Sequence, residues 1–318
     1  MTPDQPSDAL IIGGGPAGLA AAMALARACY SVVLFDSQEY RNDTAPMMHN
    51  VLCNDGREPW FFRSTAMKEM MDKYDSITFV DTQITAARQI NHGQRNAFEV
   101  SNQKGATWRG QKLILASGTR DILPSIQGYK ELWGRGIVHC LFCEGFEKKG
   151  GRFGFLDLNS RDDLSAVLMS FRLADDGVTI YTNGKGIPND MEIQEVFKIA
   201  ISRGAKIDDR EIQSFSEIPD ADGIQVHFQD GTQEDLKVLL HSPPSVNRAA
   251  DLISSLNLET VASPEGHVIS KGPVGETNIR GCFVAGDTST EAKTVNVAMA
   301  TGRCFSFVTS ICKHHVPH

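Results

Sequence analysis

Two cysteines, Cys140 and Cys143, flank two apolar residues in the segment HCLFCEGFE (139–147). A Cys-x-x-Cys pair can ligate zinc, form a structural disulfide or work as a redox couple. Zinc needs four ligands, and no second Cys/His pair with ligand spacing stands nearby. A purely structural disulfide is not expected in a reducing compartment. We therefore predict a redox couple, because this spacing lowers the pKa of one thiol and keeps its partner close enough to resolve a mixed disulfide.

The residues next to the pair could move its protons. His139 precedes Cys140 and Glu144 follows Cys143, and either side chain could deprotonate a thiol. The sequence leaves open which of them points toward the sulfur atoms. The C-terminal segment CKHHVPH (312–318) also carries potential metal ligands, but we interpret it as a frayed terminus, and no metal site is predicted.

The composition limits the protein's setting and partners. Seven cysteines in 318 residues are too few for a secreted disulfide scaffold, and the five remaining ones, which we expect to be ordinary thiols, are Cys29, Cys53, Cys282, Cys304 and Cys312. A net charge of −8 argues against nucleic acid or an anionic membrane as the main partner. The N-terminus lacks a signal-type segment, and glycines interrupt the most apolar stretch. We expect a cytoplasmic protein that does not insert into a membrane.

A dinucleotide-binding pattern occupies residues 8–36. ALII predicts a buried strand, GGGPAG a tight turn, LAAAMALARACY a helix and SVVLFD a second strand. Gly13, Gly15 and Gly18 match G-x-G-x-x-G, in which the glycines make the turn, admit a pyrophosphate and let the helix pack on the sheet. Asp36 stands 23 residues after Gly13, at the strand end where an acid can hold ribose hydroxyls.

Two later segments indicate that the cofactor is FAD. KLILASGTR (112–120) predicts a strand that ends in small residues, where the chain can pass close to a flat ring. IRGCFVAGDTST (279–290) predicts a strand that ends in Gly286-Asp287, followed by a helix that starts near Thr294. A strand, a Gly-Asp pair and a helix N-terminus are how two-dinucleotide flavoproteins hold FAD. One nucleotide site is thus expected from both ends of the chain, and the middle must be an insertion.

The inserted middle has the βαβ outline of a second dinucleotide site. GGRFGFLDLNSRDDLSAVLMSFRLA (150–174) predicts a strand, a turn and a helix, and GVTIYTN (177–183) predicts the next strand. The turn LDLNSRDD carries no phosphate-facing glycine, and Asp162 and Asp163 suit the helix dipole but repel a pyrophosphate. Where the 2′-phosphate of NADPH needs arginines, only Lys185 stands. We predict that this domain has lost NADPH binding.

These features together resemble a known family. A FAD half split by an insert, Cys-x-x-Cys at the start of that insert and GD-x(7)-VNVA near the end are similar to the low-molecular-weight thioredoxin reductases, over essentially the whole chain. The segment RNDTAPMMHNVLCNDG (41–56) resembles a subgroup that includes the dithiol oxidases of gliotoxin- and holomycin-type biosynthesis. Those enzymes close a disulfide in a small dithiol and pass the electrons through FAD to O2.

The resemblance implies roles for several residues. Cys140 would be the exchange thiol that meets the substrate, Cys143 would face the flavin, and Arg41, Asn42 and His49 would lie along FAD. The chain departs from the reductases at LDLNSRDD and TNGKG, and in having Glu144 where many reductases carry Asp. A homodimer is also implied.

The resulting prediction is an α/β flavoprotein with two dinucleotide-binding domains: a Rossmann-like FAD domain from residues 1–120 and 242–318, and an inserted, degenerate NADPH-like domain from residues 121–241. The expected FAD-binding residues are Gly13, Gly14, Gly15, Pro16, Ala17, Gly18, Asp36, Ser37, Arg41, Asn42, His49, Ala116, Ser117, Gly118, Gly286, Asp287, Val295 and Asn296. The favoured activity is oxidation of a small-molecule dithiol by O2 with release of H2O2. The alternatives are an NADPH-dependent thioredoxin reductase and a flavin-binding redox sensor without catalysis.

Overall fold

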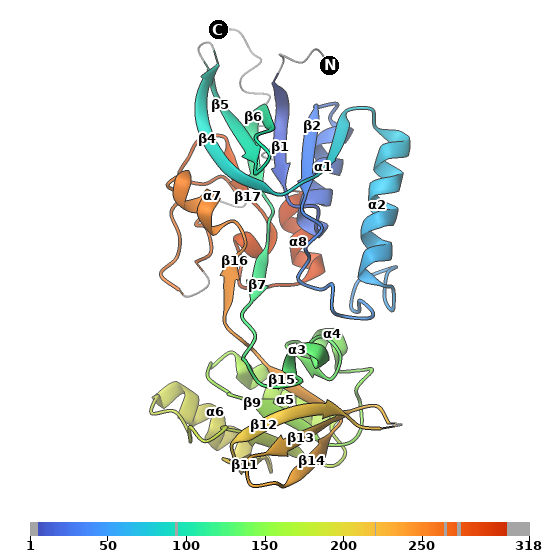
Figure 1. The fold of residues 1–318 in the computed structure, drawn as a ribbon, viewed down its shortest axis with the longest axis vertical. Helices are drawn as coiled ribbons and strands as arrows, with labels where there is room; N and C mark the ends of the chain where they lie inside the picture. The colour runs from blue at the N-terminus through green and yellow to red at the C-terminus, as the bar shows by residue number, and fades with distance from the viewer. Residues whose placement is uncertain (1–5, 93–94, 220, 264–265, 272–274, 304–318) are drawn as a thin grey trace. The chain divides into compact units, whose positions relative to one another are not determined.

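The computed structural model describes residues 6–92, 95–219, 221–263, 266–271 and 275–303. The chain divides into two compact units (Figure 1). Unit 1 contains residues 1–43, 60–121 and 245–318, and unit 2 contains residues 44–59 and 122–244. Both ends of the chain therefore build unit 1, around an inserted unit 2.

Unit 1 is built on a seven-stranded sheet with the order β3-β2-β1-β6-β5-β4, in which β17 pairs with β6 beside β5. β1, β2, β3, β6 and β17 run parallel, and β4 and β5 form an antiparallel extension. The bounds of these strands are β1 Ser7–Ile12, β2 Val32–Asp36, β3 Ile77–Asp81, β4 Ile84–His92, β5 Arg95–Asn102, β6 Thr107–Leu115 and β17 Cys282–Val284. The central parallel strands are buried along nearly their whole length, which explains their almost unbroken apolar sequences.

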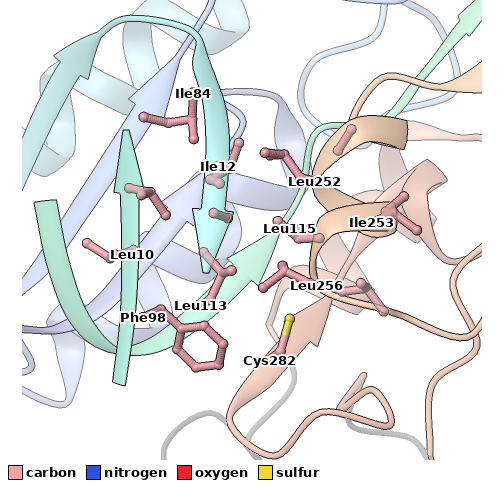
Figure 2. Close-up of a cluster of buried hydrophobic side chains, with 14 of the residues drawn as sticks. Leu10, Ile12, Ile84, Phe98, Leu113, Leu115, Leu252, Ile253, Leu256 and Cys282 are labelled. Atoms are coloured by element: carbon pink, nitrogen blue, oxygen red, sulfur yellow. The ribbon is translucent and has the colours of Figure 1, made fainter. Parts of the chain in front are cut away.

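Helices cover this sheet. They are α1 Pro16–Arg27, α2 Pro59–Lys73, α7 Ala250–Ser255 and α8 Val295–Gly302, together with a short 3₁₀ turn, η2 Gly286–Thr288. On one face, β1 and β6 residues such as Leu10 and Leu113 pack against Leu252 and Leu256 of α7, as Figure 2 shows. On the other face, α1 packs against the sheet and against α8, so the second cluster includes Ala21, Leu25 and Ala298. The predicted elements of this unit, including a helix start near Thr294, are confirmed.

Unit 2 has a five-stranded parallel sheet with the order β11-β10-β9-β15-β8. Its strands are β8 Ile137–Val138, β9 Phe153–Leu156, β10 Val178–Tyr181, β11 Lys206–Asp208 and β15 Val238–His241. Its helices are α3 Tyr129–Leu132, α4 Leu141–Glu144, α5 Asp163–Leu173 and α6 Met191–Ser202. The predicted strand, helix and strand over residues 150–183 are thus confirmed as β9, α5 and β10.

Two smaller sheets complete the units. In unit 2 a three-stranded antiparallel sheet consists of β12 Ile212–Glu217, β13 Ile224–Phe228 and β14 Gln233–Leu236. It packs with α3 around an apolar cluster that includes Tyr129, Phe215 and Leu236. In unit 1, β7 Thr119–Asp121 pairs antiparallel with β16 Ser245–Asn247, where the chain leaves unit 1 and returns to it. Among the residues described, no helix is long and apolar enough to cross a membrane.

Residues 44–59 group with unit 2, although they lie between β2 and α2 in the sequence. We call this segment the 44–59 loop. It is closed by an antiparallel bridge between Met48 and Arg57, in which the Met48 N–H donates to the Arg57 carbonyl oxygen at 2.7 Å. The Asn50 N–H donates to the Asp55 carboxylate at 2.7 Å, and Asn50 has a φ of 58°, a left-handed conformation that asparagine tolerates. The sequence pattern did not indicate this grouping.

Candidate active site

The glycine turn between β1 and α1 leaves room for a ligand at one position. A Cβ atom on Gly18 would lie 1.8 Å from the carbonyl oxygen of Gly13, and one on Gly14 would lie 2.3 Å from the Asp36 carboxylate, so the fold itself requires these glycines. A Cβ on Gly15 would meet no protein atom within 4 Å. Gly15 caps α1, whose first-turn N–H groups have no side-chain cap. A phosphate can therefore approach the helix N-terminus over Gly15.

Asp36 at the end of β2 is held in a fixed orientation. It is buried, and it accepts hydrogen bonds from the Gln38 N–H at 2.9 Å and from the Tyr40 hydroxyl. Burial and the neighbouring Asp36 raise the pKa of Tyr40, so its hydroxyl stays a donor. The Arg63 guanidinium lies 3.5 Å from the centre of the Tyr40 ring. Ser37, also predicted to bind FAD, follows Asp36 and is exposed.

Arg41 and Asn42 are both engaged by residues of unit 1. Arg41 forms a two-pronged ion pair with Asp121, with its Nε 3.0 Å from one carboxylate oxygen and its terminal nitrogen 2.9 Å from the other. The Asn42 side-chain oxygen accepts a hydrogen bond from Arg63 at 3.3 Å. Both residues flank the chain that leaves β2, and their expected position along FAD stays a prediction.

The two later segments of the predicted FAD site meet each other. The Gly118 N–H donates to the hydroxyl of Thr288 at 2.9 Å, and the Ser117 hydroxyl lies 3.4 Å from that oxygen. Ala116 precedes them in the chain and is buried. Gly118 has a φ of 69° and no atom within 4 Å of a hypothetical Cβ, so this strand end is also open to a ligand.

Asp287 lies in the η2 turn beside α8. Burial raises the pKa of its carboxyl group, and the positive charges of Arg41 and Lys293 oppose this effect. A Cβ atom on Gly286 would lie 2.9 Å from the Cβ of Ala17. The η2 turn therefore packs closely against the start of α1, which begins at Pro16. Val295 and Asn296 form the first turn of α8, whose N-cap Thr294 accepts the Val297 N–H at 3.2 Å. The predicted FAD residues other than His49 therefore all lie in unit 1.

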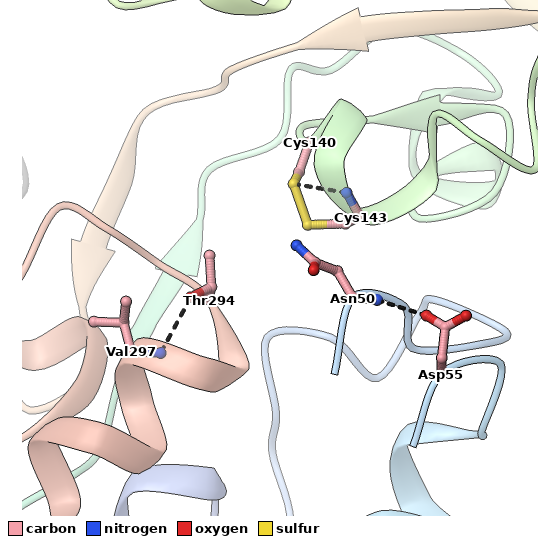
Figure 3. The surroundings of a disulfide bond; sticks show 6 residues. All are labelled: Asn50, Asp55, Cys140, Cys143, Thr294 and Val297. Carbon is pink, nitrogen blue, oxygen red and sulfur yellow. Dashed lines mark hydrogen bonds between the residues drawn. A yellow bond between two sulfur atoms is a disulfide. The ribbon is translucent and has the colours of Figure 1, made fainter. Parts of the chain in front are cut away.

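The cysteine pair begins α4 of unit 2 and forms a disulfide. Cys140 and Cys143 are joined, with 5.3 Å between their Cα atoms. Cys140 is the N-cap of α4, and its sulfur accepts the Cys143 N–H at 3.1 Å (Figure 3). Both cysteines are partly exposed, so a small molecule can reach them. A hydrogen bond to the Cys140 sulfur favours its thiolate form when the pair is reduced.

Glu144 differs sharply from His139 in its environment. Burial, reinforced by the negative charge of Glu147, raises the pKa of the Glu144 carboxyl to about 7, while Lys148 opposes the shift. A carboxyl with a pKa near the working pH is suited to accept and return a proton. His139 is exposed, and its ring lies 5.9 Å from the Trp133 ring, centre to centre.

The 44–59 loop brings two more side chains toward the disulfide region of unit 2. The side-chain amide of Asn50 points toward the Cys140–Cys143 disulfide in Figure 3. The Nδ1 atom of His49 lies 3.3 Å from a carboxylate oxygen of Glu147 and 3.7 Å from one of Asp55. Asn50 was missed by sequence reasoning, although it is adjacent to His49 in the segment that carries the subgroup resemblance. For His49 the structure shows acidic neighbours in unit 2, and a role along FAD stays a prediction.

The other cysteines show no second redox pair among the described residues. Cys282 is buried in the core of unit 1, where burial raises the pKa of its thiol to about 12. Cys29 and Cys53 are exposed and carry free thiols. Cys304, Cys312 and the histidines of the C-terminal segment lie outside the described residues. Within the described ranges, no group of three or more His, Cys, Asp or Glu side chains could hold a metal ion.

Comparisons with known proteins agree with this geometry. Residues 7–159 match the family model described as pyridine nucleotide-disulphide oxidoreductase. The chain is 37% identical over 299 residues to "Thioredoxin reductase tcpT" of Claviceps purpurea, covering 93% of this chain and 90% of that protein. The chain belongs to the thioredoxin reductase family. "Thioredoxin reductase aclD" of Aspergillus oryzae is a further relative, 36% identical over 93% of this chain and 92% of its own length.

A solved structure shows the same architecture. The crystal structure of the oxidoreductase from Agrobacterium tumefaciens matches with a TM-score of 0.84 and 28% identity, over 99% of this chain and all of that one. Members of this family are FAD-binding flavoproteins, and this chain is an FAD-binding oxidoreductase of that type with an α/β fold. The open space over Gly15 and at Gly118 fits such a cofactor, with Asp36 at the strand end that would face its ribose.

Proposed function

We propose that the protein oxidises a small-molecule dithiol to an intramolecular disulfide, with FAD as cofactor, O2 as electron acceptor and H2O2 as second product. The observation that carries this proposal concerns the turns after β9 and β10 of unit 2, where NADPH would have to bind if the enzyme were a reductase. There the carboxylates of Asp163 and Asp157 pair with turn N–H groups and with Lys185, which could otherwise contact a nucleotide's phosphates.

The turn after β9 has its own internal anion. The Asp163 carboxylate accepts the N–H groups of Ser160 at 3.1 Å and Asn159 at 3.3 Å, and the Ser242 hydroxyl at 3.3 Å. In a dinucleotide-binding turn, free N–H groups at the helix N-terminus receive the pyrophosphate. Here Asp163, the first residue of α5, instead accepts two N–H groups of the turn that precedes the helix, and an ionised carboxylate at this place would repel a phosphate.

The cation near the next strand is neutralised as well. Lys185 is the single basic residue of the TNGKG segment after β10, and its ammonium forms an ion pair of 2.5 Å with Asp157. Asp157 is the residue directly after β9. A 2′-phosphate would have to displace this carboxylate before it could reach Lys185. Both observations support a domain that no longer accepts NADPH, so electrons must enter from a thiol substrate.

The exchange chemistry follows from the cysteine pair and its neighbours. A substrate thiol gives its proton to the Glu144 carboxylate, and the resulting thiolate attacks Cys140, which breaks the Cys140–Cys143 bond and forms a mixed disulfide. The second substrate thiol loses its proton to solvent, and its thiolate attacks the substrate sulfur of the mixed disulfide. This attack displaces Cys140 as a thiolate, which the Cys143 N–H stabilises. The substrate leaves as a disulfide, and the enzyme pair holds its two electrons. FAD, when bound, would supply the acceptor for this electron pair and would allow it to pass on to O2.

The surface around the pair favours an apolar substrate. Phe142, between the cysteines, is 67% exposed, and Phe146 is 79% exposed. An apolar molecule that covers these side chains gains hydrophobic contact near the disulfide. A small dithiol of the epidithiodiketopiperazine class, as the subgroup resemblance implies, combines apolar surface with two adjacent thiols. The homodimer implied by the family resemblance stays a prediction.

An oxygen-electrode experiment tests this proposal. The purified flavoprotein is mixed under air with a reduced epidithiodiketopiperazine, and we expect one O2 consumed and one H2O2 formed per product disulfide. The Cys140→Ser variant serves as control and should consume no O2 above the dithiol's own autoxidation. Failure to turn over any small dithiol, with flavin bound and the disulfide intact, would overturn the proposal.

A second candidate function is NADPH-dependent reduction of thioredoxin. The relatives from Claviceps purpurea and Aspergillus oryzae are both named thioredoxin reductases, which favours it. It requires unit 2 to bind NADPH without a glycine in the turn after β9. Coupled reduction of thioredoxin by NADPH would support this candidate at the expense of the first.

A further inference from the structure

Asp36, the acid expected to face a ribose of the cofactor, belongs to a hydrogen-bond network within unit 1. Its carboxylate stands against the glycine turn, because a Cβ atom on Gly14 would come within 2.3 Å of it. One carboxylate oxygen accepts the Gln38 N–H at 2.9 Å, and the other accepts the Tyr40 hydroxyl. An ionised carboxylate offers about four acceptor positions, so about two remain for the hydroxyl groups of a ligand.

The Tyr40 side chain is held in turn by Arg63 of α2. The guanidinium carbon lies 3.5 Å from the centre of the Tyr40 ring, which is a cation–π arrangement. The same guanidinium donates to the Asp43 carboxylate at 2.8 Å and to the Asn42 side-chain oxygen at 3.3 Å. Arg63 is itself only 5% exposed. These contacts fix residues 40–43 against α2.

We propose that Tyr40 and Arg63 are positioning residues for the adenosine ribose of FAD. Tyr40 fixes the plane of the Asp36 carboxylate, and Arg63 fixes the Tyr40 ring, so that the remaining acceptor positions of the carboxylate receive the ribose hydroxyls. The inference goes beyond the proposed function, because it concerns recognition of the cofactor and holds equally for an oxidase and for a reductase.

The orientation of the Asp36 carboxylate decides how well it binds a hydroxyl group. Hydrogen bonds weaken steeply when the donor and the acceptor are misaligned. A side chain that is already ordered also loses less conformational entropy when a ligand binds. Burial and Asp36 raise the pKa of Tyr40, and the positive charge of Arg63 opposes this rise. A phenol polarised by such a charge is a stronger donor, so Arg63 strengthens the hydrogen bond that orients Asp36.

The test compares two flavin ligands on the deflavinated full-length protein. The ligands are FAD and its analogue that carries 2′,3′-dideoxyadenosine, which lacks both ribose hydroxyls, and their dissociation constants are measured from the change in flavin fluorescence. The wild type should prefer FAD by about a hundredfold, because two hydrogen bonds to a carboxylate are lost in the analogue. In Tyr40→Phe this preference should fall about tenfold, because Asp36 is no longer held in one orientation.

A second variant and a matched control sharpen the comparison. Arg63→Lys keeps the charge but loses the planar contact with the ring, and the preference for FAD should fall about threefold. Combined with Tyr40→Phe it should lower the preference no further, because Arg63 acts through Tyr40. The control is Tyr74→Phe, in which the lost hydroxyl lies 3.3 Å from Arg27 and the ring also has a nearby cation, Lys73 at 5.6 Å. It should keep the wild-type preference.

The ratio of the two dissociation constants separates positioning from a structural role. A structural role predicts that Tyr40→Phe weakens both ligands by the same factor, and an unchanged ratio would overturn the inference, as would equal affinity of the wild type for both ligands. Thermal unfolding shows whether each variant folds, and either variant decides alone if the other does not. The expected ratios without any dithiol turnover would retain this inference while rejecting the proposed function.

Discussion

At the scale of single residues, the two cysteines are distinguished by one hydrogen bond. Cys140 accepts the Cys143 N–H at 3.1 Å from its position as the N-cap of α4, and no such donor to Cys143 is seen among the described residues. A thiolate at Cys140 is therefore stabilised more than one at Cys143. This difference suits Cys140 as the sulfur that a substrate attacks and later releases.

We predict that the two single-serine variants differ in thiol reactivity. In Cys143→Ser the remaining Cys140 should have a lowered pKa and react with iodoacetamide about tenfold faster at pH 6.5 than Cys143 does in Cys140→Ser. Mass spectrometry of the alkylated peptide gives both rates. Equal rates, or a faster Cys143, would contradict the assignment of Cys140 as the exchange thiol.

Protonation of Glu144 should slow dithiol oxidation on the acid side of the pH–rate profile. Because its carboxyl pKa is raised to about 7, dithiol oxidation should lose rate as pH falls through 7, and Glu144→Gln should remove this limb with a large loss of rate at pH 8. The raised pKa of Glu144 also determines how folding stability changes with pH. A folded pKa above the unfolded value costs stability once pH exceeds about 4.5, and this cost is complete above about 7.

Glu144→Gln should therefore unfold at higher denaturant concentration than the wild type at pH 8, and at an unchanged concentration at pH 4. After allowance for partial solvent exposure, the gain at pH 8 is about 1 kcal/mol. Chemical unfolding at the two pH values measures it. Destabilisation at pH 8 would show that the carboxylate has a favourable partner.

At the scale of elements, substitutions in the glycine turn should distinguish the glycine needed for cofactor binding from the glycine needed for folding. Gly15→Ala should fold like the wild type and retain far less flavin, because a Cβ at Gly15 meets no protein atom but enters the open space over the α1 N-terminus. Gly18→Ala should lose folded protein, because its Cβ would lie 1.8 Å from the Gly13 carbonyl oxygen. Flavin absorbance per folded protein measures both. Full flavin content in Gly15→Ala would contradict the assigned site.

The turn after β9 provides a matched pair of aspartates. Asp163→Ala leaves the Ser160 and Asn159 N–H groups without their carboxylate acceptor and should cost about 1–2 kcal/mol in the free energy of unfolding. Asp162→Ala, one residue earlier, removes an exposed carboxylate that makes no cap hydrogen bond and should cost less than about 0.5 kcal/mol. Equal effects in urea unfolding would contradict Asp163 as the internal anion of this turn.

Local patterns predicted the elements well but not the contacts between distant segments. The β1–α1–β2 unit and the β9–α5–β10 unit follow from apolar runs and turn residues whose meaning is local. The Glu147–His49 approach and the position of Asn50 depend on how the 44–59 loop folds onto unit 2, which no periodicity encodes. The raised pKa of Glu144 likewise depends on burial, and burial of a residue in a short helix cannot be inferred from its neighbours in sequence.

At the scale of the whole molecule, the central claim concerns the origin of the electrons. Unit 1 presents an open nucleotide turn at Gly15, whereas in unit 2 the Asp163 carboxylate accepts N–H groups of the turn after β9 and Asp157 pairs with Lys185. Both units have a strand–turn–helix arrangement typical of dinucleotide-binding domains. The turn after β1 and the turn after β9 differ in charge and in the space left for a ligand. We propose that unit 2 does not accept NADPH, in which case the flavin receives its electrons from the thiol substrate.

Anaerobic stopped-flow mixing of the oxidised enzyme with NADPH tests this claim most directly. We predict that the flavin absorbance persists on mixing with excess NADPH and is lost on mixing with a small-molecule dithiol, with Cys140→Ser as the unreactive control for the dithiol. Rapid bleaching of the flavin by NADPH would contradict the account and assign the enzyme to the NADPH-dependent reductases.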